Sequence, residues 1–117
     1  SDMKAWMTHN PKCGTSRNVL AILQDRGIAP EIRDYLKTPL TRAELAALVK
    51  EMAVPAHSLV RWKESAAVAA AGIAETSSEA VLLAALAANP VLLNRPIVRT
   101  DKGIKLCRPS ETVNELL

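Results

Sequence analysis

Apolar and polar positions along this chain follow two different periods. Residues 4–8 alternate in character, which is typical of a short buried strand. After Thr15 the apolar positions recur at helical spacing and Gly27 provides a stop, so we predict a helix between them. Residues 31–35 then predict a second strand. Strand, helix and strand therefore form the first part of the predicted fold.

The middle of the chain, residues 36–94, is predicted to be helical. Residues 41–44 (TRAE) have the spacing of a capping box, and apolar residues at helical spacing follow it. Residues 56–72 predict one or two short helices. A second capping box at residues 76–79 (TSSE) opens a further helix, which an Asn-Pro pair ends. We interpret the segment as an insertion of helices into a sheet rather than as a second domain.

The C-terminal part predicts a β-hairpin followed by a helix. Residues 97–100 and 104–107 flank a turn that contains Gly103. Pro109 is expected to lie in the first turn of the last helix. The whole order is β-α-β, helices, β-β-α, which predicts an α/β fold with a mixed sheet covered on both faces. The thioredoxin-like arrangement is the best known solution of this order.

The composition is that of one folded domain. The 117 residues are 49% hydrophobic and 23% charged, and the net charge of +3 is spread along the chain, so it does not argue for nucleic acid binding. We expect a single domain over residues 4–117. We also expect a monomer, because no exposed apolar stripe is left after the core is assigned. Ser1 and Asp2, which precede Met3, are typical of an expression vector.

Membrane and metal functions are not expected. The longest apolar stretch, residues 66–74, is broken by Gly72 and is too short to span a bilayer. Two cysteines and no secretory signal indicate the reducing cytoplasm. The cysteines and histidines also lack the close spacing of metal ligands; these residues are His9, Cys13, His57 and Cys107.

Cys13 is the candidate for chemistry. It lies one or two residues before the first predicted helix, where unpaired N–H groups and the helix dipole stabilise a thiolate; the alternative is a buried, inert cysteine. Ser16 takes the place of the second cysteine of a C-x-x-C motif, so an oxidised Cys13 needs either Cys107 or an outside thiol. We expect Cys107 to be a small core residue. His9 is placed either to favour the thiolate or to act as a structural histidine.

Three arginines stand where no helical or strand pattern requires them. Arginine binds tetrahedral oxyanions through two parallel N–H donors, and it stays charged at every relevant pH. The alternative for each one is a solvated surface arginine. The three residues are Arg61, Arg95 and Arg108.

Four segments together resemble the ArsC family of arsenate reductases, the group that works with glutaredoxin. The segments are HNPKCGTSRN, TPLTRAEL, LLNRPIV and LCRPSETVNELL, and the similarity extends from about residue 4 to residue 117. The resemblance implies an α/β, thioredoxin-like mixed sheet flanked by helices, with a helical insertion between its β-α-β and β-β-α halves. Segment 62–71 departs from the family pattern.

The resemblance also implies roles for individual residues. Cys13 would be the nucleophile, His9 would favour its thiolate and Ser16 would form a hydrogen bond near the sulfur. Pro96 would follow a cis peptide bond. The residues that bind the oxyanion would be the three arginines and the start of the helix: Arg61, Arg95, Arg108, Gly14 and Thr15.

The function implied by the resemblance is the reduction of arsenate to arsenite. A thiol-arsenate adduct on Cys13 would be resolved by glutathione as co-substrate and by glutaredoxin, without a bound cofactor or metal. Two other functions remain as alternatives: a thiol transferase of the monothiol glutaredoxin type, and a transcriptional regulator of the Spx kind that binds RNA polymerase. The three arginines favour oxyanion chemistry over both.

Overall fold

The computed structural model describes residues 2–117, which form two compact units. The expectation about Ser1 lies outside the described residues. The first unit contains the chain up to Thr38 together with Arg95–Leu117, and the second unit is Pro39–Asn94. The expected single domain over residues 4–117 stays a prediction. No helix within residues 2–117 is long and apolar enough to cross a membrane.

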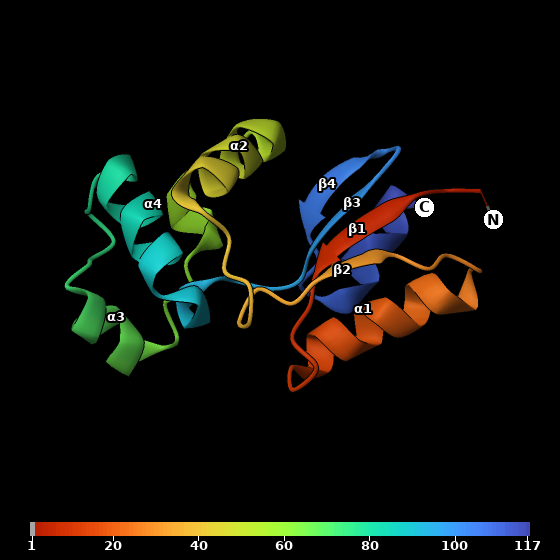
Figure 1. Ribbon diagram of the computed structural model, residues 1–117, viewed down its shortest axis with the longest axis horizontal. Coiled ribbons are helices and arrows are strands. Elements are labelled where there is room, and N and C mark those ends of the chain that lie inside the picture. Colours follow the sequence, from red (N-terminus) through yellow and green to blue (C-terminus); the bar gives the residue numbers. More distant parts are fainter. Residues whose placement is uncertain (1) are drawn as a thin grey trace. The chain divides into compact units, whose positions relative to one another are not determined.

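The first unit is a four-stranded sheet with two helical elements. Its elements are β1 (Ala5–Thr8), α1 (Gly14–Asp25), β2 (Glu31–Arg33), β3 (Ile97–Thr100), β4 (Gly103–Leu106) and the 3-10 helix η3 (Ser110–Leu116). The strands lie side by side in the order β2-β1-β3-β4 (Figure 1). β1 pairs with β2 in parallel, whereas β3 is antiparallel to both β1 and β4. The predicted α/β fold with a mixed sheet is confirmed.

One face of this sheet carries the core of the first unit. Met7 of β1 and Val98 of β3 are opposite each other in the ladder, and both side chains are fully buried. The apolar stripe of α1 and the inner side of η3 pack against them, so both helical elements of the unit cover the same face. The buried members of this cluster are Met7, Val19, Leu23, Ile28, Val98, Cys107, Val113 and Leu116.

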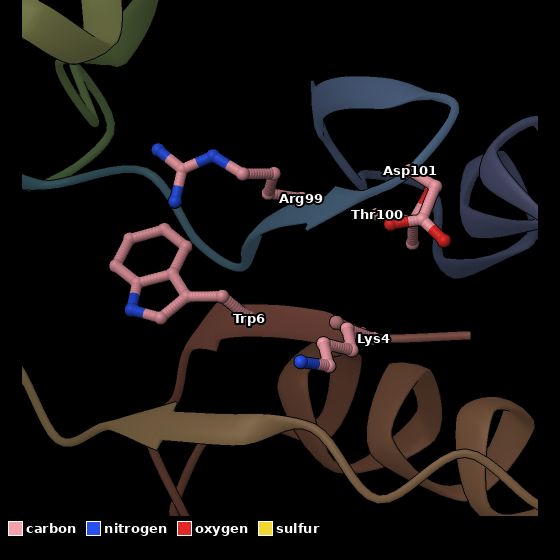
Figure 2. A pocket seen from close by; sticks show the side chains of 6 residues that line it. Lys4, Trp6, Arg99, Thr100 and Asp101 are labelled. Carbon is pink, nitrogen blue, oxygen red and sulfur yellow. The ribbon is translucent and has the colours of Figure 1, made fainter. Parts of the chain in front are cut away.

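The opposite face carries Trp6 and Arg99, because side chains alternate along a strand and these two residues are neighbours across the β1–β3 ladder. The Arg99 guanidinium lies 5.0 Å from the centre of the Trp6 ring, which is a cation–π contact. Figure 2 shows the two side chains beside a shallow hollow of about 150 Å³. Lys4 at its edge precedes β1, whereas Cys13 follows the other end of that strand. The residues that line the hollow do not include Cys13, His9 or Ser16.

The second unit is helical apart from one antiparallel β-bridge between Val60 and Leu93. Its elements are α2 (Arg42–Met52), the 3-10 helix η1 (Ala56–Leu59), α3 (Ser65–Ala71), α4 (Glu79–Ala88) and the 3-10 helix η2 (Pro90–Leu92). The predicted capping box at the start of α2 is confirmed, since Thr41 Oγ1 accepts from Glu44 N at 3.1 Å and Glu44 Oε1 accepts from Thr41 N at 2.9 Å. Buried leucines of α2 and α4 supply much of the core of this unit.

Two local predictions were wrong. The capping box expected at residues 76–79 does not form. Ser78 caps α4 instead, and both carboxylate oxygens of Glu79 accept from Ala56 N at 3.1 Å. This distant partner removes Glu79 from a local capping role. The last helix is the 3-10 helix η3, and Pro109 is its N-cap rather than a residue of its first turn.

Candidate active site around Cys13

A short turn places Cys13 between the end of β1 and the start of α1. Asn10 organises this turn, because its carbonyl accepts from Cys13 N at 2.9 Å and its side-chain oxygen accepts from Lys12 N at 3.0 Å. Cys13 then occupies the N-cap of α1 in an extended conformation. Its sulfur therefore lies at the helix end where unpaired N–H groups favour negative charge. The predicted position of Cys13 at a helix start is confirmed.

His9 and Ser16 form a buried pair below this turn. His9 Nδ1 and Ser16 Oγ are 2.6 Å apart, and Ser16 Oγ also accepts from Asn10 N at 3.1 Å. The side chains of His9 and Ser16 are 8% and 0% exposed. Burial lowers the pKa of His9, and the charge of Arg17 lowers it further against the opposite effect of Asp34. The pair therefore connects the turn to the first turn of the helix, and burial favours the neutral form of the imidazole.

The thiol of Cys13 is partly buried and acidic. Burial by itself raises the pKa of this thiol. The backbone N–H of Ser16 and the side chains of two arginines outweigh burial and lower the pKa from 9.0 to about 7. The Ser16 N–H acts on the sulfur electrostatically, since the geometry falls short of a full capping hydrogen bond. A large fraction of Cys13 is thus thiolate near neutral pH, and the thiolate is the nucleophilic form.

The two arginines are Arg95 and Arg108. Arg108 Nη1 lies 3.8 Å from the Cys13 sulfur and donates to the carbonyl of Arg95 at 3.0 Å. The Nε atom of Arg95 is buried without a hydrogen-bond partner in the described part of the chain. A cis peptide bond joins each arginine to the proline that follows it. The cis Arg95–Pro96 bond agrees with the family resemblance. The cis Arg108–Pro109 bond was not predicted from the sequence. The fold thus brings two of the three predicted arginines to the sulfur.

Arg61, the third predicted arginine, belongs to the second unit. Its backbone N donates to Leu92 O at 2.7 Å, and its Nε lies 3.2 Å from a carboxylate oxygen of Glu64. Segment 62–71, which departs from the family pattern, supplies this carboxylate. The assignment of Arg61 to the oxyanion site stays a prediction.

Cys107 is a core residue, as expected. It is fully buried with Met7 and Val98, and burial raises its pKa to about 12. A buried thiol that does not ionise is a poor nucleophile for an oxidised Cys13. Of the two resolving thiols that the sequence left open, the structure therefore favours an outside thiol.

Sequence reasoning missed Asn10 and Arg17 at this site. The signal for Asn10 was the Asn-Pro pair, which favours a turn in which the asparagine side chain accepts from a nearby backbone N–H. Arg17 lies within the segment HNPKCGTSRN, which contains no separate signal for its hydrogen bond to Pro11 O. Gly14 and Thr15, predicted to bind an oxyanion, form the first turn of α1. No three His, Cys, Asp or Glu side chains gather at a possible metal site in residues 2–117.

Comparison with known proteins identifies the family of this chain. The model of the ArsC family matches residues 8–116. The arsenate reductase of Escherichia coli K12 is 44% identical over 110 residues, which cover 93% of this chain and 77% of the relative. The arsenate reductase of Rhizobium meliloti is 41% identical over 116 residues, which cover 98% and 82% of the two chains. This chain belongs to the ArsC family.

The ArsC fold extends over the whole chain. A solved structure of an arsenate reductase from Vibrio cholerae is 35% identical, covers both chains completely and has a TM-score of 0.88. A putative arsenate reductase from Yersinia pestis has a TM-score of 0.86 at 35% identity, with 95% of this chain and 98% of the other covered. The resemblance seen in the four sequence segments and the thioredoxin-like fold that it implied are both confirmed.

Proposed function

We propose that this protein reduces arsenate to arsenite with the Cys13 thiolate as nucleophile. The observation that carries the proposal is the Cys13 sulfur at the start of α1, with a pKa of about 7 and with Arg108 Nη1 at 3.8 Å. The ArsC relatives that are named arsenate reductases support the choice of substrate. The low pKa supplies a nucleophile at neutral pH, and the arginines supply the charge that an anionic substrate needs.

The oxyanion would be bound next to the sulfur by cationic and N–H groups. A thiolate and an arsenate repel each other, so the reaction needs positive charge at the point where they meet. Arg95 suits this role because its buried Nε–H has no hydrogen-bond partner in the described part of the chain and could donate to an oxyanion. Arg108 suits it because its guanidinium is already oriented by a hydrogen bond to the Arg95 carbonyl. Gly14 and Thr15 would contribute N–H groups at the helix start. Arg61 would complete the set.

The chemistry begins with attack of the Cys13 thiolate on arsenic. One arsenate oxygen leaves as water after protonation, and a thiol-arsenate adduct forms. Glutathione displaces a second oxygen as water. A glutaredoxin thiolate then attacks the glutathione sulfur, so that a mixed disulfide forms and the electron pair of the sulfur–arsenic bond passes to arsenic, which becomes trivalent. Hydrolysis of the remaining sulfur–arsenic bond releases arsenite and restores Cys13.

Outside thiols are needed because the chain offers no second reactive thiol near Cys13. Ser16 stands where a C-x-x-C enzyme has its resolving cysteine, and the burial of Cys107 argues against its use. Glutathione as co-substrate and glutaredoxin as partner meet this need without a resident cofactor or metal. These thiols are kept reduced in the cytoplasm, where we place the reaction.

The test is an assay of NADPH consumption with glutathione, glutathione reductase and glutaredoxin supplied. We expect consumption that depends on arsenate, that is lost in Cys13→Ala and that is at least tenfold lower in Arg95→Ala at low arsenate concentration, because one charged donor is removed. A matched control is Arg42→Ala, an exposed arginine at the start of α2. If the parent reduces a glutathione mixed disulfide without any dependence on arsenate, the protein is a thiol transferase and the proposal is wrong.

A further inference from the structure

The turn that carries Cys13 is held from both sides. On the buried side, Asn10 N donates to Ser16 Oγ at 3.1 Å, and the Asn10 backbone and side chain accept the N–H groups of Lys12 and Cys13. These contacts fix the beginning of the turn and its return to the helix. None of these contacts involves the carbonyl of Pro11, which lies at the exposed tip of the turn and needs a separate hydrogen-bond donor.

Arg17 supplies that group from the first full turn of α1. Its Nη1 donates to Pro11 O at 2.8 Å, and its backbone N donates to Cys13 O at 3.0 Å. A methyl group placed on Gly14 would lie 3.8 Å from Arg17 Nη2, so the guanidinium passes beside Gly14 on its way to the turn. One side chain thus connects the helix to the residue two positions before Cys13.

The positive charges that lower the pKa of Cys13 most belong to two other arginines. The cationic groups that lower the Cys13 pKa are Arg95 and Arg108, together with the Ser16 N–H, whereas the charge of Arg17 acts on His9. The direct contact of Arg17 is instead with the turn, through Pro11 O, so we look for its influence on Cys13 in the shape of the turn. A sulfur that moved by an ångström would lose alignment with the Ser16 N–H and with Arg108, since both contacts are short-ranged.

We propose that Arg17 is a positioning residue for Cys13, whose hydrogen bond to Pro11 O holds the turn so that the sulfur stays at the helix start beside Arg108. The proposal rests on the proposed function only in taking Cys13 as the nucleophile. It concerns the position of a thiol, and alkylation of that thiol requires neither arsenate nor glutathione.

The experiment compares the pH dependence of Cys13 alkylation by iodoacetamide in the parent and in Arg17→Met, which keeps an unbranched apolar stem but lacks the guanidinium and its donors. We expect alkylation about three- to tenfold slower in the variant at pH 6 and equal rates above pH 9, because a raised pKa reduces only the thiolate fraction. The variant Cys13→Ala should not be alkylated, which would show that the measured reaction is that of the Cys13 thiol. The control is Arg26→Met, an exposed arginine at the other end of α1, about 14 Å further along the helix than Arg17.

Salt separates a positional effect from a charge effect. Loss of a distant positive charge would be screened at 1 M salt, where the Debye length is about 3 Å. A change in the turn would not be screened. We therefore expect the difference between parent and Arg17→Met at pH 6 to persist at 1 M salt. The proposal is overturned if the difference disappears in salt, or if Arg17→Met behaves like Arg26→Met.

Hydrogen exchange gives a second measurement of the turn itself. We expect the N–H groups of Lys12 and Cys13 to exchange at least about tenfold faster in Arg17→Met, while the N–H of Leu23 in the middle of the packed helix is unchanged. Unchanged exchange at both turn residues would contradict the proposal. Arg17 is exposed, so folding is expected to survive the substitution; if it does not, Arg17→Gln, whose shorter amide cannot span the same distance, takes its place. Arsenate turnover that failed in the parent would disprove the proposed function and leave these results standing.

Discussion

Arg108 contacts the Cys13 sulfur from a position 95 residues further along the chain, with Nη1 at 3.8 Å. The same nitrogen donates to the Arg95 carbonyl at 3.0 Å, so the guanidinium is oriented by the backbone before any substrate arrives. An oriented charge costs no reorganisation when an anion forms beside it. Arg108 therefore both lowers the pKa of the Cys13 thiol and belongs to the residues that would bind the oxyanion.

Arg108→Met should therefore raise the pKa of Cys13. We expect a rise of about one unit, because one of the two charged donors to the sulfur is lost. Alkylation by iodoacetamide at pH 6.5 should then be roughly five- to tenfold slower than in the parent. Arg42→Met, a substitution of an exposed arginine at the start of α2, is the matched control. A variant that alkylates at the parent rate would show that the 3.8 Å contact does not tune the thiol.

The acidity of Cys13 should also appear in the pH dependence of stability. The pKa in the folded protein, about 7, lies below the ordinary value of 9.0. The stabilisation is therefore fully present above pH 9 and is lost as the pH falls from 9 through 7. Because the residue is only partly buried, we expect about 1 kcal/mol after allowance for solvent screening. The measurement is the free energy of unfolding in urea, under reducing conditions, for the parent and Cys13→Ala at pH 6 and pH 9.5. A difference between the two proteins that is the same at both pH values would be the contrary result.

Local signals in the sequence were sufficient for most of the elements. Thr41 and Glu44 satisfy each other's backbone within one turn, so α2 begins where its capping box predicts. The hairpin around Gly103 was equally local, and the glycine has a φ of +142°, which side chains rarely adopt. At Glu79 the local signal failed, because its carboxylate accepts from Ala56 N, 23 residues away. Contacts of that range are set by packing and have no local sequence pattern.

The site could be predicted from the sequence only in part. The position of Cys13 before a helix was enough to suggest an activated thiol, since the helix end acts locally. Its contact with Arg108 depends on β3 lying beside β1 and β4 lying beside β3, and only the family resemblance pointed to it. The burial of Cys107 was expected from its strand position, but its exclusion as the resolving thiol needed the packed core. The contact of Arg17 with Pro11 O could not be predicted, because exposed arginines are common on helices and most of them only face solvent.

Ser16→Ala should destabilise the protein. The substitution leaves the buried N–H of Asn10 without its acceptor and His9 Nδ1 without its partner at 2.6 Å. An unsatisfied buried donor costs about 1–3 kcal/mol, so we expect a loss of that size in the free energy of unfolding in urea. Ser65→Ala, at the exposed start of α3, should change stability by less than about 0.5 kcal/mol. Equal effects of the two substitutions would mean that the His9–Ser16 pair has no structural role.

The two cysteines should differ sharply in reactivity. Cys13 is partly accessible, whereas Cys107 is fully buried and has a raised pKa of about 12. In the native protein, titration with a chromogenic disulfide at pH 7.5 should therefore detect one fast thiol, and addition of denaturant should release a second. Cys13→Ala should lose the fast phase and keep the slow one. Two fast thiols in the native protein would reopen Cys107 as a resolving residue.

The most direct test of the account is a titration of the Cys13 thiolate by its absorbance at 240 nm, recorded from pH 5 to pH 10 as the difference between the parent and Cys13→Ala. Arsenate reduction by Cys13 requires a thiol that ionises near neutral pH in the field of Arg95, Arg108 and the helix start. The account predicts a midpoint near pH 7. A midpoint near the ordinary value of 9.0 would contradict this prediction, because these groups would then not be acting on the sulfur.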